Sequence, residues 1–153
     1  MRIYLDTCCY NRRFYDKSLP TFSEESKAVF RISMKIVSKD LELVTSFMLH
    51  YENNCNKDTK QRDSIDIFIK NYRNIYVGVD KSDILAKKVE NIIKFGVKHK
   101  DAYHIASAIL ANCDYFITFD KKILKFKSDE IKIINPIDFI KIIEGDKNEW
   151  WRL

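Results

Sequence analysis

The chain has 153 residues, enough for one domain with a substantial hydrophobic core, and we predict a single domain over residues 1–153. Its 27 Lys and Arg outnumber its 22 Asp and Glu, which gives a formal net charge of +5 and favours a polyanionic partner. No apolar run approaches the ~20 residues that span a bilayer, and the opening residues do not resemble a signal peptide. We therefore expect a cytoplasmic protein without membrane contact.

The four cysteines agree with a reducing compartment. None of Cys8, Cys9, Cys55 and Cys113 shows a CxxC spacing, and adjacent cysteines make an awkward disulfide pair. We expect reduced thiols. A zinc site built from Cys8, Cys9 and Cys55 is the alternative, because these three lie near acidic residues in the sequence.

Strand and helix signals alternate along the first half of the chain. Residues 2–6 form an apolar run typical of a buried strand, and the capping box over residues 21–24 opens a helix. A second strand is predicted over residues 41–45. Ser46 can cap the short helix that follows, and residues 58–72 carry the apolar periodicity of another helix.

The second half continues the alternation. Ser82 is predicted to cap a helix that stops near Gly96, Asp101 to start the next helix, and Asn135-Pro136 to open a final helix ending at Gly145. Three further strands are predicted, over residues 75–79, 115–118 and 131–134. Alternation of this kind predicts an α/β fold with three α/β/α layers and a mainly parallel sheet of about five strands.

Acidic residues follow the apolar runs or start the helices at four points, at Asp6, Glu52, Asp101 and Asp120. Ligands of α/β sheets bind outside the carboxyl ends of the strands, so these acids are expected to meet there. They would repel one another unless a cation held them. Oxygen ligands suit Mg²⁺ or Mn²⁺, and one or two such ions on carboxylates are a common apparatus for hydrolysing phosphodiesters. The sequence therefore predicts a metal site that acts on a nucleic acid, with no side-chain nucleophile.

Basic and aromatic residues supply candidate contacts to that nucleic acid. Two clusters follow Asp6 and Asp120, formed by Arg12, Arg13, Lys121 and Lys122. The alternative for the lysines is a solvated helix face. Trp150 and Trp151 are candidates for stacking on bases, or for covering the domain or an oligomer contact.

Four segments in succession resemble the blocks of PIN domains: Ile3-Tyr4-Leu5-Asp6-Thr7-Cys8-Cys9-Tyr10-Asn11-Arg12, Ser46 to Glu52, Asp101-Ala102-Tyr103-His104-Ile105-Ala106-Ser107-Ala108, and Cys113-Asp114-Tyr115-Phe116-Ile117-Thr118-Phe119-Asp120. PIN domains are metal-dependent ribonucleases, and their bacterial single-domain members include the VapC-type toxins. The resemblance therefore implies RNA cleavage with Mg²⁺ or Mn²⁺. It also makes an antitoxin protein and a second copy of the chain candidate partners.

Individual positions carry over from this resemblance. The family's acidic quartet corresponds to Asp6, Glu52, Asp101 and Asp120, with Glu42 a nearby alternative to Glu52. Thr118 matches the small hydroxyl residue before the last acid. Asn11 matches a polar residue of the first loop, and Arg13 stands where relatives with a similar opening usually have proline.

Other interpretations of the same residues remain open. Asp101 and Asp120 are also good helix N-caps. His104 can assist a leaving group or be a hydrogen-bonded, semi-buried histidine. The domain can also bind RNA or a protein without cutting. A third possible function is that of a phosphorylation-controlled receiver module, with Asp80 as the phosphoryl acceptor and Thr118 as the switch residue.

Overall fold

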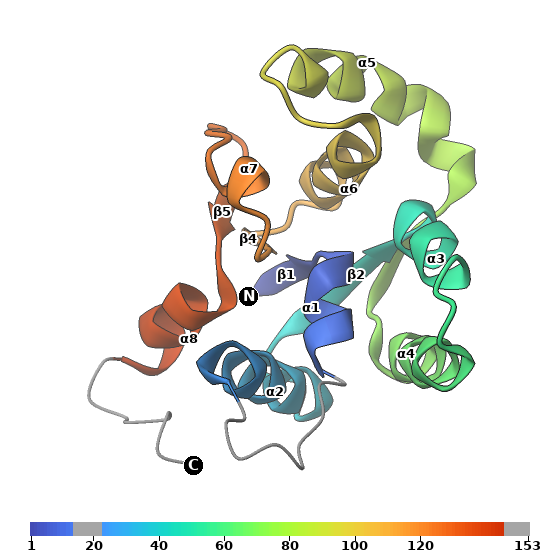
Figure 1. The fold of residues 1–153 in the computed structure, drawn as a ribbon. Coiled ribbons are helices and arrows are strands. Elements are labelled where there is room, and N and C mark those ends of the chain that lie inside the picture. Colours follow the sequence, from blue (N-terminus) through green and yellow to red (C-terminus); the bar gives the residue numbers. More distant parts are fainter. Residues whose placement is uncertain (14–22, 146–153) are drawn as a thin grey trace.

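The computed structural model describes residues 1–13 and 23–145, in which five strands and a series of helices alternate (Figure 1). The strands are β1 (Arg2–Leu5), β2 (Glu42–Ser46), β3 (Ile75–Val77), β4 (Tyr115–Ile117) and β5 (Lys132–Ile134). They form one sheet in the order β3-β2-β1-β4-β5, and every neighbouring pair is parallel. The predicted α/β fold class is confirmed, with a sheet that is parallel throughout.

The helices connect these strands as crossovers. They are α1 (Thr7–Arg13), α2 (Glu24–Val37), α3 (Phe47–Asn54), α4 (Thr59–Tyr72), α5 (Ser82–Ile93), α6 (His99–Leu110), α7 (Lys121–Leu124) and α8 (Pro136–Glu144), with a 3₁₀ turn η1 (Val79–Lys81) before α5. Two predicted caps are present. Ser46 Oγ accepts a hydrogen bond from the Leu49 amide at 3.3 Å, and Asn135 Oδ1 accepts one from the Asp138 amide at 2.8 Å. Gly145 ends α8 with a φ of +81°, a conformation that glycine adopts without steric cost.

Three helix starts differ from the sequence prediction. Helix α5 begins at Ser82 itself, because the η1 turn leads into it and leaves Lys81 at the cap position. Helix α6 begins at His99 with Lys98 before it, so Asp101 lies inside the first turn and is not the N-cap. Helix α2 is capped by Ser23, whose hydroxyl accepts from the Ser26 amide at 3.1 Å. Thr21 and Phe22 of the predicted capping box lie outside the described residues.

Helix α1 was not among the predicted elements. Its seven residues have no acidic side chain in the first turn. Tertiary packing stabilises it instead, because Cys9 and Tyr10 are buried in the core and the Cys9 amide donates to the Asp6 carbonyl at 2.9 Å. Short helices of this kind carry little local signal.

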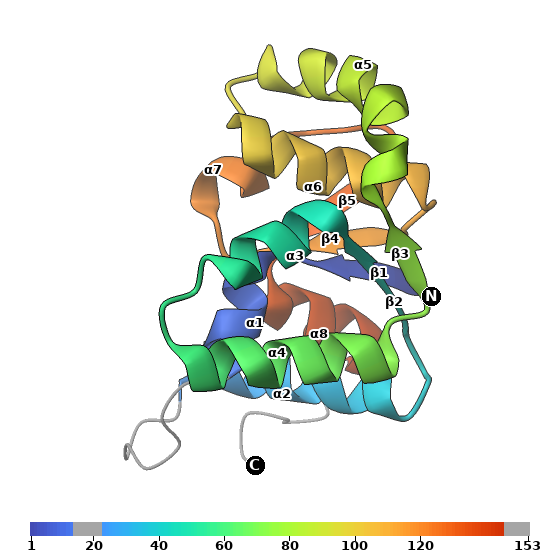
Figure 2. The ribbon, with the colours of Figure 1, turned by 90° about the vertical axis from the view of Figure 1, so that its right-hand side faces the viewer.

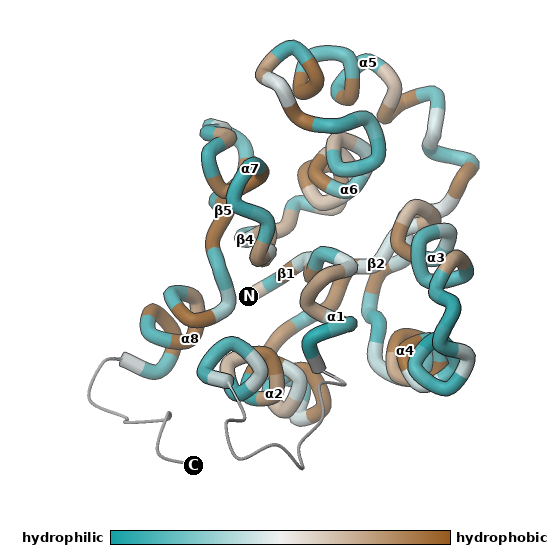
Figure 3. The backbone as a smooth tube through the Cα atoms, in the orientation of Figure 1, coloured by the Kyte–Doolittle hydropathy of each residue, from teal (hydrophilic) through white to brown (hydrophobic). Residues whose placement is uncertain are grey.

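Two hydrophobic clusters cover the two faces of the sheet (Figure 2). The first packs α1, α2, α4 and α8 against one face, with Leu43 and Ile117 pointing into it. The second packs α5 and α6 against the other face, where Tyr4, Val44 and Phe116 lie. Figure 3 shows hydrophobic and hydrophilic stretches alternating along the helices, as amphipathic packing requires. Because all neighbouring strands are parallel, their carboxyl ends lie along the same side of this sheet.

The strand order separates this fold from a receiver module. In the flavodoxin-like order 2-1-3-4-5 the third strand adjoins the first, whereas here β3 is an edge strand and β4 adjoins β1. Asp80 lies in η1 beyond the end of β3, with 74% of its side chain exposed and Lys81 at 3.9 Å. An acceptor aspartate at the sheet centre is therefore absent from this position, and the receiver interpretation is wrong.

Within the described part of the chain, no helix is both long enough and apolar enough to cross a membrane.

Candidate metal centre

Asp6 lies at the centre of the sheet edge, directly after β1. The residue is 5% exposed, and its carboxylate accepts three hydrogen bonds. Oδ1 accepts from the Thr7 amide at 2.8 Å, and Oδ2 accepts from Thr118 Oγ1 at 2.7 Å and from Cys8 Sγ at 3.6 Å. All three donors are neutral, and no described Lys or Arg forms an ion pair with it. The carboxylate is therefore held in place while its charge stays unneutralised.

Thr118 and Asp120 follow the adjacent strand β4. Thr118 is fully buried, and its Oγ1 accepts from the Asp120 amide at 3.0 Å while donating to Asp6. Asp120 caps α7, because its Oδ1 accepts from the Lys122 amide at 2.8 Å and the Ile123 amide at 3.3 Å. The capping role predicted for Asp120 is thus real. Both bonds use Oδ1, which leaves Oδ2 for a ligand.

Glu52 reaches the same edge from helix α3. Its Oε1 accepts a hydrogen bond from Thr7 Oγ1 at 2.7 Å and a short one from His104 Nε2. Burial raises the pKa of Glu52, but the hydrogen bond and charge of His104, the hydrogen bond from Thr7 and the charge of Lys100 outweigh it and lower the pKa below its ordinary value. Glu52 is therefore an ionised carboxylate at neutral pH.

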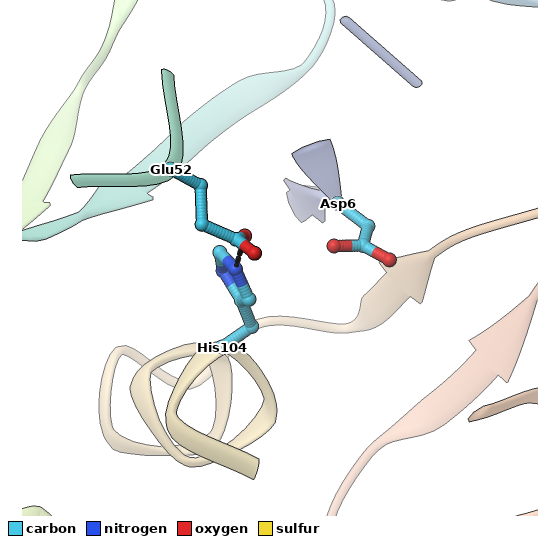
Figure 4. Close-up of side chains that lie close together, drawn as sticks. All are labelled: Asp6, Glu52 and His104. Atoms are coloured by element: carbon cyan, nitrogen blue, oxygen red, sulfur yellow. Dashed lines mark hydrogen bonds and ion pairs between the residues drawn. The ribbon is translucent and has the colours of Figure 1, made fainter. Parts of the chain in front are cut away.

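Ligand atoms of Asp6, Glu52 and His104 lie within 4.8 Å of one another, close enough to share one ion. Figure 4 shows Glu52 and His104 facing each other, with the Asp6 carboxylate across from them. His104 is fully buried and hydrogen-bonded, deeper than the semi-buried position that was one of its two sequence interpretations.

Asp101 comes from the first turn of α6. Its pKa is raised from 3.8 to about 6, first by burial and then by the charge of Asp6, with Asp120 and Glu52 adding to the effect and His104 opposing it. No described residue donates a hydrogen bond to its carboxylate. The four acids therefore share one electrostatic environment, in which adding the last negative charge is unfavourable.

A hard divalent cation fits this arrangement. The available donors are the carboxylate oxygens with the His104 nitrogen beside them, and the excess negative charge that raises the Asp101 pKa is what a bound cation would remove. The alternative zinc site of cysteines is not formed by the described residues. Cys9 is buried with its Sγ 3.4 Å from the Ile117 carbonyl oxygen, and Cys55 is exposed at the end of α3.

Asn11 and Glu42 were further candidate residues for the site. Asn11 is exposed on α1, and its carbonyl accepts from Gln61 at 3.2 Å. Glu42, at the opposite end of β2, pairs with Arg2 at 3.3 Å and does not reach the acids. The structure therefore favours Glu52 over Glu42.

The predicted basic contacts are only partly described. Arg12 stacks 4.8 Å from the ring centroid of Phe119 and lies 3.7 Å from Glu25. Lys121 and Lys122 are exposed at the start of α7, beside Asp120. The side chain of Arg13 and both Trp150 and Trp151 lie outside the described residues.

Several residues of the centre escaped the sequence analysis. Thr7 contacts two of the acids, Lys100 lowers the pKa of Glu52, and Tyr4 hydrogen-bonds His104 from inside β1. One signal was available for Tyr4, since a tyrosine in a fully buried strand needs a partner for its hydroxyl. The residue that supplies the partner is set by the fold and is not visible in the sequence.

No family model matches this sequence, and a search among curated proteins finds no match. Among solved structures, the chain is similar to one in the crystal structure of VapBC2 from Rickettsia felis bound to a DNA fragment from its promoter. The two share 14% identity with a TM-score of 0.59, over 88% of this chain and 98% of that one. The fold is PIN-like. At this identity the likeness establishes the fold, while activity and partners have to be argued from the site.

Proposed function

We propose that this protein is a divalent-metal-dependent ribonuclease that hydrolyses RNA phosphodiester bonds. The observation that supports the proposal is that Asp6 and Glu52 lie within ligand distance of each other at the carboxyl end of a PIN-like sheet, and that the charges of Asp6, Asp120 and Glu52 help to raise the pKa of Asp101 to about 6. Perturbed acids in such an edge are typical of functional sites. Structural aspartates would have salt-bridge or hydrogen-bond partners, and Asp101 has no described donor.

We assign these acids to two metal sites. Asp6, Asp101 and Asp120 would hold one Mg²⁺ or Mn²⁺, and Glu52 together with Asp6 would complete a second site. A divalent ion in such a site lowers the pKa of a water molecule and stabilises negative charge on the phosphate. The carboxylates are fixed for this purpose by Thr118 and Thr7, which donate hydrogen bonds to Asp6 and Glu52.

Substrate attraction would come from cations around the acids. Lys121 and Lys122 are exposed beside Asp120, Lys100 lies near Glu52, and Arg12 packs on Phe119 next to Asp120. Together with the net charge of +5, they favour binding of a polyanion along this edge. Contacts to phosphates are independent of sequence, so base selection must come from other residues.

A toxin role with an antitoxin partner is the finer form of the proposal. It is supported by the structural likeness to a chain of VapBC2 and by the sequence resemblance to VapC-type toxins. Expression of the chain should then arrest growth, and an adjacent small reading frame should relieve the arrest. Growth arrest by wild type but not by Asp6→Asn would support it, and size-exclusion chromatography would show whether the chain forms a homodimer.

The nuclease proposal is tested with a mixed RNA pool incubated with the purified protein in Mn²⁺, Mg²⁺ or EDTA. Asp6→Asn serves as the inactive variant, and Asp63→Asn as a matched control, because Asp63 is exposed on α4. We expect cleavage by wild type and Asp63→Asn with either metal, and none by Asp6→Asn. Binding of RNA without cleavage would instead support a non-catalytic PIN-like module.

A further inference from the structure

A chain of buried hydrogen bonds runs from helix α3 through the sheet to Glu52. The Leu49 amide donates to Ser46 Oγ at 3.3 Å, and Ser46 Oγ lies 2.6 Å from the hydroxyl of Tyr4. That hydroxyl lies 2.5 Å from His104 Nδ1, and His104 Nε2 contacts Glu52 Oε1. Tyr4 and His104 are fully buried and Ser46 is 1% exposed. The acid thus stands at the solvent end of a chain that otherwise lies inside the protein.

Counting donors and acceptors assigns a direction to this chain. A carboxylate oxygen accepts hydrogen bonds, so we assign the donor role in the contact with Glu52 to His104 Nε2. If Nδ1 accepts from Tyr4, the Tyr4 oxygen accepts from Ser46, and Ser46 accepts from the Leu49 amide. Every hydroxyl proton of the chain then has an acceptor. The reverse direction would leave the Ser46 proton without a described acceptor.

The consequence is that both ring nitrogens of His104 are engaged. The Tyr4 hydroxyl occupies Nδ1, and Nε2 contacts Glu52. Packing makes the Tyr4 and His104 rings rigid. The Tyr4 ring stacks on the Phe116 ring with 5.3 Å between centroids, and it meets the His104 ring edge-on with 5.6 Å between centroids. A hydrogen bond from a rigid, buried donor limits the rotamers that Glu52 can adopt.

We propose that Tyr4 and His104 are positioning residues that hold Glu52 in the geometry of a metal ligand, and that His104 itself does not bind the ion. This rests on the proposed function of the same site. His104 lies within ligand distance of Asp6 and Glu52, so direct coordination is the competing interpretation. In the positioning role Nε2 hydrogen-bonds to Glu52, whereas in direct coordination Nε2 binds the ion. Spectroscopy separates these two roles, because only a coordinated nitrogen gives a signal in the spectrum of the bound ion.

The test is an Mn²⁺ titration of the full chain, with free Mn²⁺ measured by electron paramagnetic resonance. Tyr4→Phe removes one hydroxyl and keeps the ring, and we expect the Mn²⁺ Kd to rise about tenfold, towards that of Glu52→Gln. Tyr115→Phe is the matched control, because it removes the same atom from β4 on the other face of the sheet. Its Kd should equal that of wild type.

A second pair of variants keeps the result independent of folding. Ser46→Ala should weaken Mn²⁺ binding and Ser46→Thr should restore it, with circular dichroism confirming that each variant is folded. Spin-echo spectra of bound Mn²⁺ should contain no signal from a coordinated histidine nitrogen.

Three results would overturn the positioning role: a wild-type Kd in Tyr4→Phe, a wild-type Kd in Glu52→Gln, or a coordinated nitrogen. Each leaves the nuclease proposal standing if wild type binds Mn²⁺. A wild-type protein that binds no Mn²⁺ at all would remove the metal site and both proposals with it.

Discussion

Replacing Asp101 with asparagine should stabilise the metal-free protein, and the gain should depend on pH. In the folded chain the pKa of Asp101 is raised from 3.8 to about 6, by burial and then by the charge of Asp6. The folded state therefore binds the proton more tightly than the unfolded state. The stability that this group contributes is complete below about pH 4 and is lost as the pH rises through about 6. Asparagine has no proton to lose and keeps the neutral shape.

The size of the effect follows from the shift. At ~1.4 kcal/mol per pKa unit, a rise from 3.8 to about 6 corresponds to an upper bound of ~3 kcal/mol. The Asp101 carboxyl keeps partial contact with water, and solvent screening reduces this to about 1 to 2 kcal/mol. For a domain of this size that is a rise in Tm of about 2 to 8 °C. The lowered pKa of Glu52 acts in the opposite sense, but only below its ordinary value of 4.5, beneath most of the range from about pH 4 to 6 over which Asp101 acts.

Thermal and urea unfolding in EDTA, at several pH values between 4 and 7.5, measures this. Asp101→Asn should exceed wild type by about 1 to 2 kcal/mol at pH 7.5, and the difference should shrink towards zero near pH 4. Asp63→Asn controls for the loss of one surface charge and should show no such trend. The reasoning is refuted if Asp101→Asn is less stable than wild type at pH 7.5, or if the difference in unfolding free energy is the same at every pH. Asp101 would then be an ordinary structural residue.

Three further predictions concern the same edge of the sheet. Mn²⁺ at about 100 times its Kd should raise the wild-type Tm at neutral pH by about 5 to 10 °C. Asp6→Asn should lose most of this rise, and a full response in the variant would contradict the assignment of Asp6 as a metal ligand. Thr118→Ala should lower the free energy of unfolding in urea by about 1 to 3 kcal/mol, because it leaves the Asp6 carboxylate and the Asp120 amide without a hydrogen bond. Thr118→Ser keeps the hydroxyl and should not lose this stability. Equal losses in both variants would mean that the methyl group matters instead. Replacing Arg12 and Arg13 together should flatten the salt dependence of RNA binding in Ca²⁺, by about 1 to 2 in log–log slope, and an unchanged slope would place them away from the RNA.

The strands and the carboxylates at their ends could be read from the sequence because the signals are local. A buried parallel strand is a short apolar run, and an acid directly after it, such as Asp6, has few structural uses. The caps formed by Ser46 and Asn135 are equally local, since each side chain bonds an amide a few residues ahead. For these features sequence neighbours are also spatial neighbours.

The parts that were wrong or missed depend on distant contacts. The start of α6 at His99 instead of Asp101 is set without any side-chain cap, so no residue type marks it. Helix α1 forms because Tyr10 packs into a core assembled from other elements. The Tyr4–His104 hydrogen bond joins residues from β1 and α6, which come together only when the sheet is complete. No single sequence contains that information in a readable form.

If these carboxylates hold the metal for water-mediated hydrolysis of RNA, the RNA fragments produced in Mn²⁺ must carry the ends that water leaves. The most direct measurement identifies those ends for wild type and Asp6→Asn side by side. Attack by water leaves no cyclic phosphate, whereas attack by the RNA's own 2′-hydroxyl does. We predict metal-dependent wild-type fragments without 2′,3′-cyclic phosphate, and no fragments from Asp6→Asn. Cyclic ends, cleavage in EDTA, or equal cleavage by Asp6→Asn would contradict the account.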